Sequence, residues 1–131
     1  MSDVKAVRYL LANSAGLIAV VPATRIAAGP LPQGTALPAI AVTHVSGTTN
    51  SLISEQGRAV TARVQVTIMA TTYVQQKAVL ALVRAAVPRT RGTVNGVAVE
   101  TILREPDGPD FGDYEANIYM QTQDYIVKYT E

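Results

Sequence analysis

The sequence contains no cysteine, no tryptophan, one histidine and one phenylalanine among its 131 residues. Without cysteine the chain cannot form a disulfide, a thiolate zinc site or a thiol nucleophile, which excludes disulfide-rich secreted scaffolds and cysteine hydrolases. A surplus of charge is also missing, because eleven basic and ten acidic side chains give a net charge of +1. Proteins that wrap nucleic acid need an excess of lysine and arginine, so the composition disfavours that class as well.

Long apolar runs are absent too. The longest early run, residues 15–23, is broken by Gly16 and Pro22, whereas a membrane span needs about 20 apolar residues. The first residues lack the charged-then-apolar layout of a signal peptide, so we expect synthesis in the cytoplasm and no membrane partner. With 48% hydrophobic residues, a chain of this length can bury one core, and we expect a single domain over residues 1–131.

Local patterns predict two helices. Ser2 can cap a first helix, whose apolar residues recur at helical spacing up to Asn13. The second helix follows Thr72, which forms a capping box with Gln75, and it ends near Ala86 because Pro88 comes next. Its apolar stripe is assigned to Val74, Ala78, Ala81, Leu82 and Ala85, widened by Val79 and Val83.

Alternating and β-branched segments predict strands at 25–28, 39–45, 59–70, 94–103 and 116–129. Asn95-Gly96 is typical of a tight hairpin, and residues 46–57 and 105–115 are expected to be long loops. The order of elements favours an α+β domain, an antiparallel sheet with two helices packed on it and long loops between strands. The last strand is apolar on both faces, which favours helices on one face and a second subunit on the other.

No pattern indicates catalysis, a metal or a cofactor. His44 shares a strand face with Ile40 and Val42, and we interpret it as a structural histidine bonded to a backbone partner. The acidic residues of 105–115 lack the alternate spacing of a calcium loop and fit a solvated segment instead. The glycines and serines match no phosphate-binding loop or nucleophile elbow. We therefore expect a protein that is not an enzyme.

Charge is distributed unevenly along the chain. Residues 56–99 hold six basic side chains and no acidic one, whereas residues 100–131 hold eight acidic and two basic ones. If the two blocks lie on opposite flanks, identical subunits attract head to tail, and such contacts close into rings or grow into filaments. Alternatively, the blocks neutralise each other within one sheet. The candidate interface residues are Arg58, Arg63, Arg84, Arg89 and Arg91 on the basic flank and Asp107, Asp110, Asp113 and Glu115 on the acidic flank.

The sequence also resembles a known family. The N-terminal helix, the Arg25-Ile26 strand, the loop GPLPQG at 29–34, the segment LPAIAV at 37–42, the strand 59–70 and the closing QDY at 123–125 are similar to the tail-completion, or tail-terminator, proteins of long-tailed bacteriophages. The resemblance implies an α+β subunit of a ring, typically six-fold. Such a ring sits on the last ring of the tail tube, stops tube growth and offers a surface to the head connector.

The resemblance further implies a structural protein of the virion tail or neck, made in the host cytoplasm. Its expected partners are itself as a homohexamer, the tail tube protein, the head-tail connector proteins and DNA only in transit through the lumen. Leu52 and Ile53, at the tip of the 46–57 loop, are the candidate axial contact with tube or connector, and Asp107, Asp110 and Asp113 could line the lumen instead. The alternative is another head-tail adaptor or a non-enzymatic α+β binding module.

Overall fold

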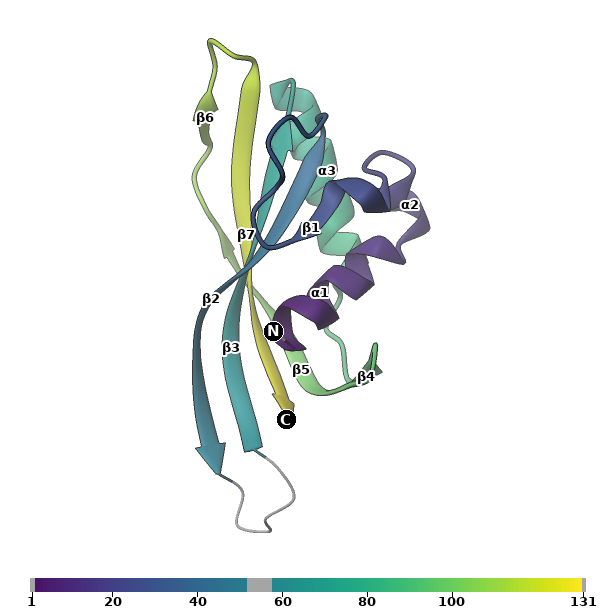
Figure 1. Ribbon diagram of the computed structural model, residues 1–131, viewed down its shortest axis with the longest axis vertical. Coiled ribbons are helices and arrows are strands. Elements are labelled where there is room, and N and C mark those ends of the chain that lie inside the picture. Colours follow the sequence, from purple (N-terminus) through teal and green to yellow (C-terminus); the bar gives the residue numbers. More distant parts are fainter. Residues whose placement is uncertain (1, 52–57, 131) are drawn as a thin grey trace.

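A long, twisted sheet with all its helices on one side forms the frame of the molecule (Figure 1). The computed structural model describes residues 2–51 and 58–130. The elements in chain order are α1 (Ser2–Ala12), α2 (Ala15–Ile18), the 3-10 turn η1 (Ala23–Arg25), β1 (Ile26–Ala28), β2 (Ala39–Ser51), β3 (Arg58–Ala70), α3 (Tyr73–Ala86), β4 (Gly92–Val94), β5 (Val97–Asp107), β6 (Phe111–Asp113) and β7 (Ile118–Thr130). This arrangement confirms the expected α+β class.

The strand that comes last in the sequence lies in the middle of the sheet. The strand order is β1-β2-β3-β7-β5-β4, and β6 pairs with β7 beyond the end of β5. Only β1 and β2 are parallel, and every other pairing is antiparallel. β7 therefore joins the half of the sheet built by β1 to β3 to the half built by β4 and β5.

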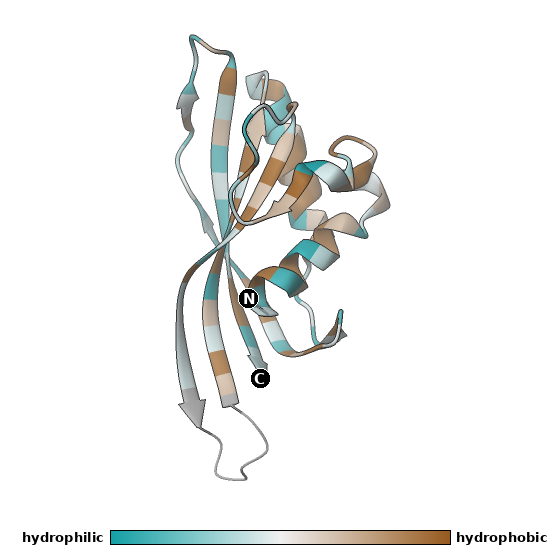
Figure 2. Ribbon diagram, viewed as in Figure 1, coloured by the Kyte–Doolittle hydropathy of each residue, from teal (hydrophilic) through white to brown (hydrophobic). Residues whose placement is uncertain are grey.

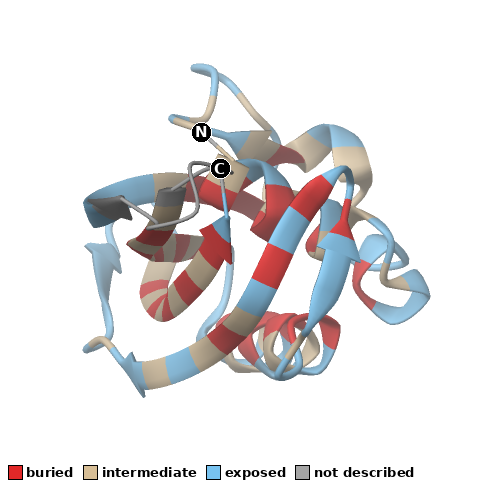
Figure 3. Ribbon diagram, turned by 90° about the horizontal axis from the view of Figure 1, so that it is seen from below, coloured by how far each residue is buried: buried red, intermediate tan, exposed pale blue. Residues whose placement is uncertain are grey.

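The core lies between the sheet and the helices. Along β3 every second residue from Val60 to Ala70 is buried, and the buried positions of β7 from Gln121 to Tyr129 face the same side (Figure 3). Along β3, hydrophobic residues recur at these alternate positions (Figure 2). They pack against Val4, Val7 and Leu11 of α1 and against the inner face of α3. The alternation that predicted β3 is thus the signature of a sheet covered on one face.

Helix α3 begins where expected but buries only part of the predicted stripe. The hydroxyl of Thr72 accepts a hydrogen bond of 3.1 Å from the backbone N–H of Gln75, while the Gln75 side chain reaches back to the N–H of Thr71 at 3.0 Å. Burial is confirmed for Val79 and Val83 of the predicted stripe, but its centre is wrong, since Val74 is 78% exposed. The larger side chains decide the orientation, because a buried alanine contributes little apolar area. The buried residues are Gln76, Val79, Leu80, Val83 and Ala86.

Strands extend into both of the predicted loops. β2 continues past residue 45 to Ser51, paired with β3 after a register shift between His44 and Ser46. β5 continues to Asp107, and β6 adds a further short pairing with β7. The extensions of β2 and β5 are polar because no helix covers these parts of the sheet. Strands can pair there without an apolar face to bury. The 94–97 hairpin is confirmed, with positive φ at Asn95 and Gly96 as a type I′ turn requires.

The sheet side opposite the helices is called the open face below. Its upper end is covered by the loop between β1 and β2, which forms an apolar groove with Met69 and Ile118 and buries Ala39 and Ala41. The rest of the open face carries residues of intermediate exposure, among them Thr61 and Arg63 of β3, Asp124, Ile126 and Lys128 of β7, and Leu103 of β5. No helix within residues 2–51 and 58–130 is long and apolar enough to cross a membrane.

Candidate assembly surface

Three buried glutamines connect α3 to the sheet. Gln76 of α3 and Gln121 and Gln123 of β7 are 1%, 4% and 0% exposed. The Gln76 amide donates to the backbone oxygen of Met120 at 3.1 Å and to the side-chain oxygen of Gln121 at 3.2 Å. Gln123 donates to the backbone oxygen of Glu105 at 2.5 Å. Both side-chain polar atoms of Gln121 and Gln123 are paired, whereas the side-chain oxygen of Gln76 has no hydrogen-bond partner among the described residues.

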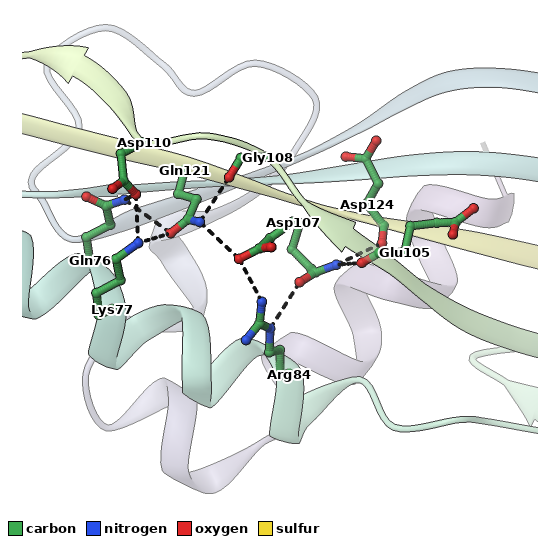
Figure 4. A network of polar contacts seen from close by, with 10 residues as sticks. Gln76, Lys77, Arg84, Glu105, Asp107, Gly108, Asp110, Gln121 and Asp124 are labelled. Carbon is green, nitrogen blue, oxygen red and sulfur yellow. Dashed lines mark hydrogen bonds and ion pairs between the residues drawn. The ribbon is translucent and has the colours of Figure 1, made fainter.

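Charged side chains surround these glutamines and pair across the helix-sheet boundary (Figure 4). Arg84 of α3 donates to the side-chain oxygen of Gln123 at 3.1 Å and to the carboxylate of Asp107 at 2.9 Å. Lys77 donates to Asp110 at 2.7 Å. This hydrogen bond raises the pKa of Lys77 and lowers the pKa of Asp110. The two basic side chains of α3 are thereby paired with the last residue of β5 and with Asp110, which lies between β5 and β6 of the same chain.

A second ion-pair group crosses the open face. The Arg63 guanidinium on β3 lies 2.8 Å from the carboxylate of Asp124 on β7 and 3.7 Å from that of Glu105 on β5. Three neighbouring strands thus contribute one cation and two anions. All three side chains are partly exposed, so the group contributes little stability by itself. It does leave this part of the sheet with its charges paired.

The predicted interface residues divide into two sets. Arg63 and Arg84 contact acidic residues of their own chain, and Asp107 and Asp110 contact α3. These four residues therefore form their ion pairs within one molecule, which is the alternative given above for the two charged blocks. Four other predicted interface residues are exposed and form no ion pair within the described ranges. They are Arg89, Arg91, Asp113 and Glu115. Arg58 begins β3, while Leu52 and Ile53 lie outside the described residues.

His44 has a carboxylate partner, so the backbone partner expected for it is wrong. Its Nδ1 lies 2.5 Å from a carboxylate oxygen of Asp3, which is fully buried in the first turn of α1. Burial acts to raise the pKa of Asp3, but hydrogen bonds, that with His44 foremost, lower it by more, and the net pKa lies below its ordinary value. The contact anchors the start of α1 to β2.

This anchor predicts an acid-sensitive contribution to stability. Because the folded state keeps Asp3 ionised while the unfolded chain takes up a proton near 3.8, the free energy of unfolding should fall as the pH drops below about 4. The contribution is complete above that value and is lost as the pH falls through the lowered pKa of the folded state. Thermal melts across this range should show a shallower decline for Asp3→Asn than for the parent, and equal slopes would contradict the assignment.

Both long edges of the sheet are open over part of their length. β1 pairs with β2 only from Ile40 to Val42, so β2 beyond that point has β3 on one side and no described strand on the other. On the opposite edge, β4 pairs with β5 only from Val97 to Val99. Beyond that point β5 has β7 alone as a partner within the described ranges. Over these stretches the edges have no second strand partner among the described residues, and their backbone groups can pair with another strand.

The glutamine network was not predicted from the sequence, although the alternating pattern of β7 contains a signal for it. Gln121 and Gln123 share the alternating face of Tyr125 and Val127, so a polar pair continues an apolar stripe. Such a break in the pattern indicates buried polar contacts. Among the described residues, no group of three or more histidine or acidic side chains could hold a metal ion.

Comparisons with known proteins agree with this fold. The sequence of residues 5–129 matches the model of a protein family described as "Tail completion protein gp17". No curated protein matches the sequence. A solved chain from the structure titled "Virion of native gene transfer agent (GTA) particle" has the same fold, with a TM-score of 0.71 and 13% sequence identity, over 98% of this chain and 94% of that one.

Proposed function

Since the chain belongs to the tail completion protein gp17 family, a family of structural phage tail proteins, we propose that it is the subunit of a terminator ring. The ring, a homohexamer, caps the tail tube, ends its polymerisation and joins the tail to the head connector. It works by shape and contact, without enzymatic activity, as part of the virion tail or neck after assembly in the host cytoplasm. DNA passes through its lumen.

The observation that carries this proposal is the family match over residues 5–129. The fold shared with a chain of a gene transfer agent virion supports it, because that chain comes from a virion particle. The elongated form of the sheet is a further support. It gives each subunit two distant ends, with the turn between β6 and β7 at one end and the end of β2 and the start of β3 at the other (Figure 1).

The two ends are the proposed axial contacts. Leu52 and Ile53 follow β2 in the sequence, and we assign to them a contact with the tube or the connector. The opposite end exposes Phe111 and Tyr114, which are 39% and 52% exposed, and aromatic side chains of this kind are enriched in protein interfaces. The unpaired charges Arg89 and Arg91 remain the candidates for contacts with acidic residues of a neighbour, and Asp113 with Glu115 for contacts with basic ones.

The test is the mass of the purified protein by light scattering over a concentration series, at low and high salt. We expect a species near six times 13.9 kDa. Reversing Arg89 and Arg91 to glutamate together should weaken this species, and the loss should be larger at low salt, where charge contacts between subunits are strongest.

The matched control reverses Lys5, an exposed cation of α1, which should leave the assembly unchanged. A protein that stays monomeric at every concentration, and that also fails to bind the ends of tail tubes in electron micrographs, would contradict the terminator ring. It would favour the non-enzymatic binding module.

A further inference from the structure

The open part of β2 has few of the features that normally protect a sheet edge. From Thr43 to Thr49 it carries no lysine, arginine, aspartate, glutamate or proline, and its main irregularity is the register shift after His44. Natural edge strands are usually short, charged or interrupted by proline, because an unguarded edge accepts another strand. This stretch is therefore suited to pairing with a strand from another molecule.

A complementary edge lies on the other side of the same sheet. β5 is open from Glu100 onward, beyond the residues that β4 covers. Pro106 has no N–H to donate and ends the usable stretch. The open edge of β5 is thus short and bounded, and it spans residues 100–105.

The two edges lie at the same level of the sheet. Ser46 of β2 pairs with Arg63 of β3, which pairs with Ile126 of β7, which pairs with Leu103 of β5. In the same way, a second row runs from Thr48 through Thr61 and Lys128 to Thr101. Each row starts at the open edge of β2 and ends at the open edge of β5.

The directions of the strands also agree. Three successive antiparallel pairings separate β2 from β5, so these two strands run in opposite directions. A copy of the chain rotated about an axis along the strands would bring its β5 beside β2 of the first copy, antiparallel and at the same level. A contact of this kind is heterologous, and repeated rotation closes it into a ring.

We propose that residues 43–49 of β2 in one subunit pair with residues 100–105 of β5 in the next, so that one sheet continues from subunit to subunit. The inference rests on the proposed function, because it names the contact that holds the terminator ring together. It assigns the main lateral contact to backbone hydrogen bonds, with the charged side chains in a secondary role.

Engineered cysteines test this pairing cleanly, because the chain has none of its own. Thr48→Cys is combined with Thr101→Cys or with Leu103→Cys, two alternatives that allow for a register offset caused by strand tilt. Within one molecule the β2 and β5 positions are separated by three strand spacings, about 14 Å. A disulfide needs Cα atoms within about 7 Å, so it can form only between molecules.

Under mild oxidation, at least one pair should give covalent multimers on non-reducing gels, since oxidation also traps short-lived contacts. The matched control is Thr48→Cys with Arg104→Cys, which places the second thiol on the opposite face of β5. It should give about tenfold less product, because thiols on opposite faces do not meet. Thermal melts check that each variant folds.

The mass of the cysteine-free parent separates the two proposals. Rings of the parent together with specific cross-links support both. Rings without cross-links overturn the strand pairing and leave the terminator function intact. Cross-linked chains that never close support the pairing and contradict the ring. Absence of both association and cross-links, together with failure to bind the ends of tail tubes, overturns the two proposals.

Discussion

Replacing Tyr125 with alanine is expected to lower the free energy of unfolding by about 3–5 kcal/mol, because it leaves a large cavity in the core. Tyr125 is 0% exposed and comes first by volume among the fully buried side chains of the described ranges. It lies on the central strand β7, between Val64 of β3 and Arg104 of β5. A cavity there affects both halves of the sheet, and denaturation in urea measures the loss.

Tyr125→Phe is the informative companion variant. The Tyr125 hydroxyl is buried without a hydrogen-bond partner among the described residues, and burial raises its pKa to about 12. Removing a buried, unpaired hydroxyl should be neutral or increase stability by about 1 kcal/mol. A loss as large as that of the alanine variant would mean that the hydroxyl has a hydrogen-bond partner. It would also mean that packing of the Tyr125 aromatic ring does not account for the loss of stability.

Arg84→Glu is expected to cost about 2–3 kcal/mol, because it removes the donor to a buried oxygen and places like charges together. Arg84 bonds the side-chain oxygen of Gln123, which is fully buried, and the carboxylate of Asp107. In the variant, the side-chain oxygen of Gln123 loses its donor, and the new glutamate carboxylate lies close to the carboxylate of Asp107. Denaturation in urea should show an earlier midpoint with an unchanged slope.

Arg89→Glu is the matched control for this charge reversal. Arg89 is exposed and forms no ion pair within the described ranges, so the same change in net charge should alter stability by no more than about 0.5 kcal/mol. Equal losses in the two variants would mean that net charge, and not the contact with Gln123, determines the effect. The pair also shows why assembly is better tested at Arg89 and Arg91 than at Arg84.

The elements predicted correctly are those with strong local causes. Alternation over 59–70 follows from one covered face, the Asn95-Gly96 turn from backbone conformation, and the ends of α3 from Thr72 and Pro88. The extensions of β2 and β5 were missed because polar residues form strands only when a partner strand is available. The stripe of α3 was predicted correctly at Val79 and Val83 and misassigned elsewhere, because the count of apolar residues ignored their size.

The charge contacts depended on topology that no local pattern contains. Arg84 and Asp107 are 23 residues apart, and they meet because α3 crosses β7 beside the end of β5. From the sequence, pairing within a subunit and pairing between subunits were equally compatible with the two charged blocks. The buried glutamines follow the same logic, since only the position of β7 under α3 brings Gln76 to Gln121.

The central position of β7 also sets the order in which the molecule can be completed. During synthesis, β1 to β3 and β4 to β5 leave the ribosome before the strand that joins them, which is the last 13-residue strand of the described chain. Until it is released, the two half-sheets have no common partner, and the edges of β3 and β5 stay unoccupied. Contacts between residues so distant in sequence form slowly. Completion of the sheet therefore waits for β7, and a nascent chain that stops before Ile118 has no strand to join the two half-sheets.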